Sequence, residues 1–181
     1  QRAVDTCPDG RQGLRFFAKT GSTNDAALAW SADGAPDLSL VYAEEQTRGR
    51  GRGRRTWITP PGVALAFSLI LRPRADEQDL LEGFTALGAL AVCEAVEAGG
   101  MQPEIKWPND VLLDRRKFCG VLVDAVWLGE KVDAVVLGIG VNVLEGSVPA
   151  AANVQFPATC LQTSAGKLID RLALLREILQ A

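Results

Sequence analysis

The first half of the chain alternates short apolar runs with polar turns. Three of these runs, Leu14–Ala18, Leu38–Tyr42 and Val63–Leu71, are rich in leucine, valine or phenylalanine. Their length and composition predict β-strands that contribute to a buried core. The polar residues 1–13 before them predict no more than a lead-in segment.

Longer apolar patterns predict helices. Asp76–Gly99 is interpreted as the main helix, because its apolar residues recur at helical spacing and two glycines end it. Its expected apolar stripe consists of Leu80, Leu81, Phe84, Leu87, Leu90, Ala91 and Val92. A loop-like stretch over 145–163 is then followed by Ala165–Leu179, which predicts a final amphipathic helix.

Another helix start follows Gly21. Ser22 or Thr23 can cap the run Ala26–Trp30, and Asp25 lies in the first turn, where the helix dipole favours a negative charge. In one interpretation these residues are only caps. In the other they face a ligand, because the N-terminus of a helix attracts anions.

The middle of the chain predicts hairpins. Val111–Leu113 and Phe118–Val126 are interpreted as two arms, and a turn at Gly129-Glu130 leads into Val132–Leu137. The glycines of Gly138-Ile139-Gly140 are expected to break that strand and to let the backbone approach a planar or anionic group. Strands in the centre with helices around them predict an α+β domain with a mixed, mainly antiparallel sheet.

An arginine-rich segment separates two of the predicted strands. Five arginines fall within residues 48–55, namely Arg48, Arg50, Arg52, Arg54 and Arg55, and glycines separate the first four. Glycine allows close backbone approach, and arginine supplies a fixed positive charge with a forked donor, so the segment suits a phosphate or carboxylate. Such alternation also occurs in disordered nucleic-acid-binding tails, but a loop held at both ends by strands favours the small-anion interpretation.

Composition narrows the chemistry further. The 181 residues carry a formal net charge of −3 and include no histidine, which excludes histidine-dependent triads and imidazole zinc sites. With the positive charge concentrated in one loop, general nucleic-acid binding is not expected. The four cysteines show no metal-ligand spacing, so we expect reduced thiols in a cytoplasmic protein, no protein metal site and no membrane span.

These motifs together resemble the catalytic domain of biotin–protein ligases, also called biotin–[acetyl-CoA-carboxylase] ligases. The resemblance runs from about Ser22 to the end of the chain. The segments that carry it are Ser22-Thr23-Asn24, Glu45-Gln46, Gly49-Arg50-Gly51-Arg52, Trp57, Lys106-Trp107-Pro108-Asn109-Asp110, Arg116-Lys117 and Gly138-Ile139-Gly140-Val141-Asn142. The Lys-Trp-Pro-Asn-Asp pentapeptide is the most specific of them.

The resemblance implies a class II aminoacyl-tRNA synthetase-like fold and a two-step reaction. Biotin and ATP, with Mg²⁺, would give biotinyl-5′-AMP, which would then acylate a lysine of a biotin carboxyl carrier domain. It implies catalytic roles for Lys117, Arg52 and Asp110. The implied biotin-binding residues are Ser22, Thr23, Asn24, Gln46, Gly49, Arg50, Lys117 and Gly120. The implied ATP- and adenylate-binding residues are Arg50, Arg52, Trp57, Lys106, Asn109 and Asn142, with Trp57 packing over the nucleotide and Asn142 reading the adenine edge.

The charges agree with these roles. A carboxylate that attacks a phosphate is repelled unless cations lie between the two anions, and Arg50, Arg52 and Lys117 supply such cations. The acceptor lysine must lose a proton before it attacks, because its free pKa is about 10.4. Asp110 is the candidate to orient or deprotonate that lysine. The alternative for Asp110 is a turn carboxylate paired with Lys106.

The chain departs from the family pattern at two places in the arginine-rich segment, the first being Arg48, which stands where a small residue is common. The family usually reads Gly-Arg-Gly-Arg-x-Gly-Arg before the tryptophan, whereas Gly53 and Arg54 stand here in exchanged order. A gapless count selects Arg52 as the gripping arginine but leaves Arg54 as the alternative. We also expect residues 1–181 to form one catalytic domain, with no N-terminal helix-turn-helix, no operator binding and no C-terminal SH3-like domain, as a monomer or homodimer.

Three other functions compete with the ligase. A lipoate ligase or octanoyltransferase has the same fold, and the transferase needs a cysteine beside a lysine, as Cys119 is beside Lys117 in sequence. The arginine loop argues against the transferase, because an acyl carrier presents no adenylate to grip. The others are a non-catalytic protein that binds biotin or its adenylate, and an RNA-binding Arg-Gly module.

Overall fold

A single seven-stranded sheet organises the protein. The computed structural model describes residues 13–77, 80–148 and 157–181. In spatial order the strands are β1 (Leu14–Phe17), β2 (Ser39–Ala43), β3 (Ala64–Leu71), β7 (Lys131–Asn142), β6 (Arg116–Leu128), β5 (Asp110–Leu113) and β4 (Glu104–Lys106). Every neighbouring pair is antiparallel except β1 with β2. The predicted mixed, mainly antiparallel α+β domain is confirmed.

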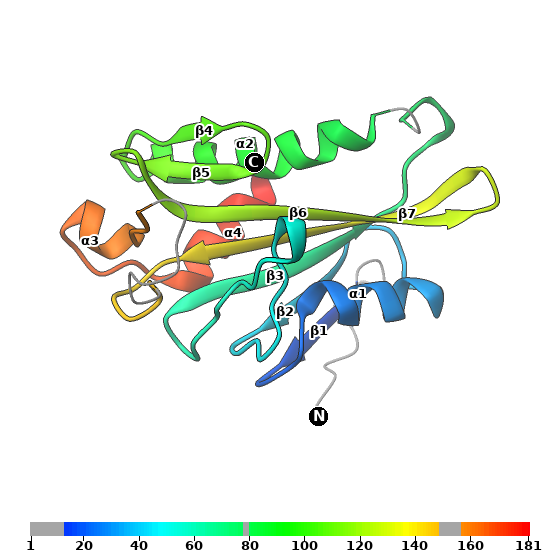
Figure 1. The fold of residues 1–181 in the computed structure, drawn as a ribbon, viewed down its shortest axis with the longest axis horizontal. Helices are drawn as coiled ribbons and strands as arrows, with labels where there is room; N and C mark the ends of the chain where they lie inside the picture. Colours follow the sequence, from blue (N-terminus) through cyan, green and yellow to red (C-terminus); the bar gives the residue numbers. More distant parts are fainter. Residues whose placement is uncertain (1–12, 78–79, 149–156) are drawn as a thin grey trace.

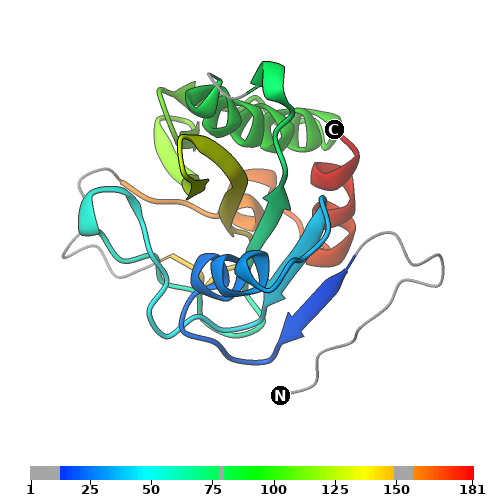
Figure 2. The same cartoon turned by 90° about the vertical axis from the view of Figure 1, so that its right-hand side faces the viewer.

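Helices cover the two faces of the sheet unequally. On one face lies α1 (Thr23–Ala32), which contacts β2, β3 and β7, and on the other lie α2 (Leu81–Ala98) and α4 (Arg171–Gln180), which contact each other (Figure 1). Figure 2 shows α1 and the arginine loop on one side of the strands and α4 on the other. The remaining helical segments are short: α3 (Leu161–Ala165) and the 3-10 turns η1 (Arg52–Arg54) and η2 (Ala75–Glu77). No described helix is long and apolar enough to cross a membrane.

The alternation of side chains along the strands separates two cores. Leu65 and Phe67 of β3 and Ile139 of β7 join the large cluster under α2 and α4, whereas Ile70 and Val136 join the smaller cluster under α1. Neighbouring strand residues point to opposite faces, so each strand contributes to both clusters. Burial of these apolar side chains on both faces holds the central strands rigid.

Small residues on the α1 face leave part of the sheet uncovered. The register pairs Gly140 of β7 with Gly120 of β6 and with Ala66 of β3, and it pairs Gly138 with Ser68 and Leu122. Glycine, alanine and serine side by side make a shallow floor, because no long side chain rises from them, and Leu122 lies at its edge. This floor, beyond the N-terminal end of α1, positions the site described below.

The first long helix is shorter than the sequence pattern predicts. It begins at Leu81 instead of Asp76, which lies in the separate turn η2. Its buried face is also different from the predicted stripe, because Leu80, Leu87 and Leu90 are exposed. Ala91 and Val92 of the predicted stripe do meet the core, and they are joined by Ala89, Cys93, Ala95 and Val96. The buried face of this helix consists of small apolar residues, whereas several of its leucines face solvent. The spacing of apolar residues along the sequence does not distinguish these two faces.

Two other predictions are corrected. The helix predicted over Ala165–Leu179 begins only at Arg171, as α4, where Asp170 caps it by accepting hydrogen bonds from the backbone of Leu172 and Ala173. Most of α3 lies in the stretch predicted as a loop, and Gly166, at φ 64°, ends it. The strand predicted to break at Gly138 continues as β7 to Asn142, since both glycines pair on both sides. Residues 149–156 of the predicted loop lie outside the described residues.

Candidate functional site

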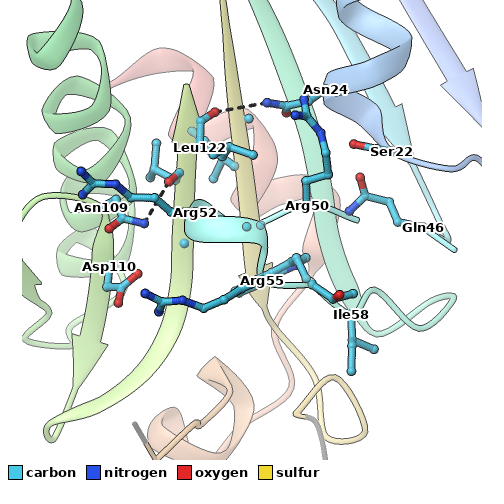
Figure 3. A pocket seen from close by; sticks show the side chains of 18 of the residues that line it. Ser22, Asn24, Gln46, Arg50, Arg52, Arg55, Ile58, Asn109, Asp110 and Leu122 are labelled. Carbon is cyan, nitrogen blue, oxygen red and sulfur yellow. Dashed lines mark hydrogen bonds between the residues drawn. The ribbon is translucent and has the colours of Figure 1, made fainter. Parts of the chain in front are cut away.

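A cavity of ≈ 750 Å³ opens on the α1 face, between the N-terminus of α1, the arginine loop and strands β5, β6 and β7 (Figure 3). Most of the residues predicted from the sequence meet there. Those that line it are Ser22, Thr23, Asn24, Gln46, Arg50, Arg52, Trp57, Asn109, Asp110, Lys117, Gly120 and Asn142. Gly49 and Lys106 lie beside the cavity without lining it.

One end of the cavity is built from neutral hydrogen-bonding groups. The backbone N–H of Thr23 donates to Gln46 Oε1 at 2.7 Å, and the Thr23 hydroxyl donates to the same oxygen at 3.1 Å. Gln46 Nε2 donates to Thr59 Oγ1 at 3.0 Å, which fixes the amide of Gln46 in one orientation. Ser22, just before the helix, is buried but its side chain makes no capping bond. This end therefore offers ordered polar groups in a buried setting, as recognition of a neutral ring requires.

Behind that end, a chain of buried polar groups continues into the sheet. Ser68 Oγ lies 2.9 Å from Thr23 Oγ1 and donates to Asn24 Oδ1 at 2.7 Å. Asn24 Nδ2 donates to Asp124 Oδ2 at 2.8 Å and lies 3.3 Å from the carbonyl oxygen of Leu122 (Figure 3). The side chain of Asn24 fills the space over Gly138, where a Cβ atom would stand 1.9 Å from Asn24 Oδ1.

Trp57 lies flat across the glycine floor. A Cβ atom at Gly140 would stand 2.4 Å from the indole, and one at Gly120 would stand 3.2 Å from both the indole and Lys117 Nζ. The indole Nε1 is buried without a hydrogen-bond partner, and Lys117 Nζ lies 5.5 Å from the ring centroid. The loop reaches this position because Gly49, whose Cβ would stand 2.4 Å from the Trp57 carbonyl oxygen, lets the two chains pass closely.

The other end of the cavity is charged. Lys117 Nζ donates to Asp110 Oδ1 at 2.6 Å, and Lys106 Nζ lies 3.5 Å from Asp110 Oδ2. The carboxyl group of Asp110 is almost fully buried, so the two ammonium groups offset the cost of its desolvation. The pairing with Lys106 that was the alternative for Asp110 is thus present, together with a shorter pairing to Lys117.

Two asparagines at this end are held by backbone carbonyls. Asn109 Nδ2 donates to the carbonyl oxygen of Val121 at 3.2 Å, and the buried Asn142 donates to that of Thr159 at 3.2 Å. In each case the amide oxygen remains available to a ligand within the described contacts. Both side chains are therefore oriented before any ligand arrives.

The arginines of the loop differ in their surroundings. Arg50 Nε lies 2.9 Å from Asp25 Oδ1 and Arg50 Nη2 lies 2.6 Å from Asp124 Oδ2, so two carboxylates meet its charge. Arg52 and Arg55 line the cavity, and in Figure 3 the side chain of Arg55 extends toward Asp110. Arg54 does not line the cavity and has a φ of 65°, which points to a turn position.

Sequence reasoning missed several residues of this site. The sequence predicts no separate role for Arg55, although this arginine lies two residues before Trp57 and lines the same cavity. Ser68 and Asp124 lie inside strand-like runs and become recognisable only when the register of β3, β6 and β7 is known. A polar residue in an otherwise apolar strand was the one available signal.

Cys119 does not reach the cavity. It is fully buried, and burial raises the pKa of its thiol well above the ordinary range despite the nearby Lys117. Cys93 and Cys160 are also buried and free. Within the described part of the chain, no three His, Cys, Asp or Glu side chains gather so that they could hold a metal ion.

Comparison with known proteins agrees with the geometry. Residues 16–142 match the model of the biotin/lipoate A/B protein ligase family. The bifunctional ligase/repressor BirA of Bacillus subtilis is 37% identical over 169 residues, which are 93% of this chain and 52% of that protein. The biotin–[acetyl-CoA-carboxylase] ligase of Paracoccus denitrificans is 36% identical over 161 residues, 86% of this chain and 65% of that protein.

Solved structures give the same result. The biotin protein ligase of Aquifex aeolicus in complex with biotin and ATP superposes with a TM-score of 0.76 at 33% identity, covering 92% of this chain and 67% of that one. The chain spans about half the length of the BirA relatives. Because the family model matches residues 16–142, which are more than half of the chain, the chain belongs to the biotin/lipoate A/B protein ligase family.

Proposed function

We propose that the protein is an ATP-dependent biotin–protein ligase that forms biotinyl-5′-AMP and transfers the biotinyl group to a lysine of a biotin carboxyl carrier domain. The observation that carries the proposal is the polarity of one cavity. Its first end holds neutral donors and acceptors on Thr23 and Gln46, and its second end holds Lys117, Arg52 and Arg55. Biotin has a neutral ureido ring at one end and a carboxylate at the other, so both ends find complementary groups.

The neutral end would recognise the ring. The Thr23 hydroxyl and the Gln46 amide are already held by hydrogen bonds, so binding costs little side-chain entropy. Ser22 and Asn24 complete this wall. Gly49 and Gly120 would contribute by close backbone approach. The indole of Trp57, which lies on the glycine floor, would pack against the nucleotide.

The charged end would carry out the first step. A carboxylate oxygen of biotin attacks the α-phosphorus of ATP, the bond to the bridging oxygen breaks, and pyrophosphate leaves. Lys117 lies where both anions would meet, and Arg52 would grip the acyl-phosphate formed. Arg50 lines the same wall, but because Asp25 and Asp124 meet its charge, we assign the phosphate to Lys117 and Arg52 first. Asn109, Lys106 and Asn142 would hold the nucleotide, with Asn142 on the adenine.

Asp110 is the candidate for the second step. The amine of the acceptor lysine attacks the acyl carbon, AMP leaves with the bonding electrons, and the amine loses a proton. Because Asp110 accepts from Lys117 at 2.6 Å and lies 3.5 Å from Lys106, its negative charge is shared with two cations, and we assign it to orienting the incoming amine.

Mg²⁺ does not find a protein site here. Among the described residues no acidic cluster could hold it, and Asp110, the carboxylate that lines the cavity, is already bonded to Lys117. The ion would therefore enter with the ATP phosphates, and none of the steps above relies on it.

An octanoyltransferase fits this site less well. Its cysteine would have to form a thiolate at the substrate, whereas burial holds Cys119 in its protonated state and away from the cavity. Because Cys93, Cys119 and Cys160 are unpaired, we place the ligase in the reducing cytoplasm. We also propose that it acts as a monomer or homodimer.

One incubation tests the proposal. The chain is mixed with biotin, ATP and Mg²⁺, and the products are analysed by mass spectrometry. A biotin carboxyl carrier domain is then added, with a carrier whose acceptor lysine is replaced by arginine as control. Biotinyl-AMP followed by one biotin per intact carrier is the expected result. Biotinyl-AMP without transfer would limit the activity to the first step. Neither product would reject the ligase, and binding of biotin without any product would favour the non-catalytic binding protein. An octanoyl carrier that loses its acyl group to the protein would favour the transferase.

A further inference from the structure

Asp124 is the least expected polar residue of the site. It lies on β6 with its carboxylate on the α1 face, does not line the cavity, and contacts two residues that do, Arg50 and Asn24. We propose that Asp124 is a positioning residue that fixes Arg50. Through Arg50 it would hold the arginine loop, residues 48–55, against the neutral end of the cavity that Thr23 and Gln46 form, which we call the neutral pocket. The catalytic significance of this role rests on the proposed ligase function. The first test below does not, because it uses the ligand-free protein.

The contacts of Arg50 support this role. Its Nη2 and Nη1 lie 2.6 Å and 3.4 Å from the two carboxylate oxygens of Asp124, and its Nε lies 2.9 Å from Asp25. Asp25 is 55% exposed and Asp124 only 25% exposed at the side chain, so solvent screens the first pair more than the second. Asp124 is therefore the stronger anchor of the loop.

The same carboxylate also holds the pocket wall. Asp124 Oδ2 accepts from Asn24 Nδ2, and the Asn24 carbonyl accepts from Ser68, whose hydroxyl lies 2.9 Å from that of Thr23. An ionised carboxylate is an acceptor only, so it must receive the amide hydrogens of Asn24, which turns the Asn24 carbonyl toward Ser68. One group thus orients both the neutral pocket and the charged loop.

The chain offers a close chemical control. Asp133 is also an aspartate of the β6–β7 hairpin, and it pairs with Arg72 at 2.8 Å, far along the strand from the loop. Its side chain is 38% exposed, comparable with Asp124. Asp133→Asn therefore removes a similar ion pair without touching the cavity.

The first test follows backbone hydrogen exchange of the loop in the ligand-free protein. Two amides report on it: Gly51 N–H donates to Arg55 O at 2.7 Å and Trp57 N–H donates to Gly49 O at 2.8 Å. Asp124→Asn keeps an acceptor for Asn24 but loses the charge that faces Arg50. We expect exchange at these two amides to rise about tenfold, as the loss of a charge-assisted hydrogen bond implies. Asp133→Asn should stay within about twofold of the parent.

A double-variant cycle decides whether Asp124 acts through Arg50. In an Arg50→Gln background, Asp124→Asn should add less than about a twofold change. An undiminished effect in that background, or parent-like exchange in Asp124→Asn, would overturn the proposal. If Asp124→Asn, which lies on β6, folds poorly, Arg50→Lys tests the same contact from the loop side. A single ammonium cannot span both carboxylates, so its loop should also exchange faster, and parent-like exchange would count against the role.

The second test uses the enzyme and separates positioning from general damage. Asp124→Asn should release biotinyl-AMP about tenfold faster while its Kd for biotin changes less than about threefold, because Asn24 keeps its acceptor. Equal losses in both quantities would indicate structural damage and reject the specific role. If the parent protein makes no biotinyl-AMP, the ligase proposal fails, and the ligand-free exchange measurement still decides the role of Asp124.

Discussion

Lys117 Nζ lies 2.6 Å from Asp110 Oδ1, so the cation proposed to bridge biotin and ATP is already bonded to a nearly buried carboxylate. This pair holds the ammonium group in the cavity before a ligand enters. The side chain of Lys117 is only 24% exposed, so this lysine is part of the cavity wall and is not a freely solvated surface group. Preorganised charge of this kind costs no reorganisation when the reaction begins.

Lys117→Ala should slow adenylate formation strongly and lower stability moderately. Loss of the bridging charge is expected to slow biotinyl-AMP synthesis by about 10- to 100-fold, and the carboxylate left behind costs about 1–3 kcal/mol of unfolding free energy. Synthesis is measured by mass spectrometry and stability by urea titration. Lys131→Ala, at the exposed end of β7, serves as the control. Synthesis at the parent rate by Lys117→Ala would leave Lys117 a structural residue.

Arg52→Gly should weaken retention of biotinyl-AMP more than its synthesis. A charge-assisted hydrogen bond contributes about 1.5–3 kcal/mol, so retention should fall by about one to two orders of magnitude. The escaped mixed anhydride acylates accessible amines, and bystander proteins mixed with the enzyme should be labelled on a biotin blot.

Arg54→Gly is the matched control for that experiment. Arg54 lies outside the cavity with a φ of 65°, a conformation that glycine adopts without strain, so this variant should keep its adenylate and be no less stable. Bystander labelling by Arg54→Gly and not by Arg52→Gly would transfer the gripping role to Arg54.

The loop residues Arg48–Arg55 should resist trypsin better when the adenylate is bound, although Asp124 already holds Arg50 without a ligand. Three glycines make the loop costly to hold in one shape, and Arg52 and Arg55 have no ion pair among the described contacts, so an anion supplies their missing partner. Digestion with and without a biotinyl-AMP analogue is followed by mass spectrometry. Identical cleavage in both samples would contradict ordering of the loop by its ligand.

The strands and the sequence motifs were predictable because each is encoded locally. Apolar runs located β2 and β3, and the Lys-Trp-Pro-Asn-Asp segment located Asp110. The ends of α3 and α4 were missed although Gly166 and Asp170 are standard stop and start signals. The role of Asp124 was out of reach, because its partners Arg50 and Asn24 are 74 and 100 residues away and only the strand register brings them together.

Gly140→Ala should disable the site without disturbing the core. The added Cβ would lie 2.4 Å from the Trp57 indole, so the ring must leave the floor. We expect the affinity for a biotinyl-AMP analogue to fall about tenfold or more by calorimetry, since the ring that packs against the nucleotide is displaced. Gly83→Ala, in α2 with its nearest neighbour at 3.9 Å, is the control and should gain about 0.5–1 kcal/mol of stability. Parent-like affinity in Gly140→Ala would show that Trp57 does not contribute to ligand binding.

A cluster at the base of the arginine loop gives a pH-dependent signal. Arg171 of α4 donates to Glu44 Oε2 at 3.0 Å, to Tyr42 Oη at 3.1 Å and to the carbonyl oxygen of Ala64 at 3.0 Å. Glu44 also accepts from Tyr42 at 2.6 Å and from the backbone N–H of Gly62. Burial alone would raise the pKa of Glu44, but the hydrogen bonds from Tyr42, Arg171 and Gly62 lower it. Glu44 therefore stabilises the fold above the ordinary glutamate pKa, and this stabilisation is lost as the pH falls through its lower folded pKa.

Tyr42 should report on this cluster from the alkaline side. Burial, followed by the hydrogen bond to Glu44, raises its pKa from 10.0 to about 12. The protonated phenol thus stabilises the fold at all pH values below the unfolded pKa, and this contribution disappears as the pH rises from 10.0 to about 12. Because Tyr42 is the single tyrosine of the chain, its ionisation can be followed by ultraviolet absorbance without assignment. Glu44→Gln should move the inflection below the parent value while burial keeps it above 10.0. An inflection unchanged by Glu44→Gln would show that the Glu44 carboxylate does not raise the pKa of Tyr42, which would contradict the effect of their 2.6 Å hydrogen bond.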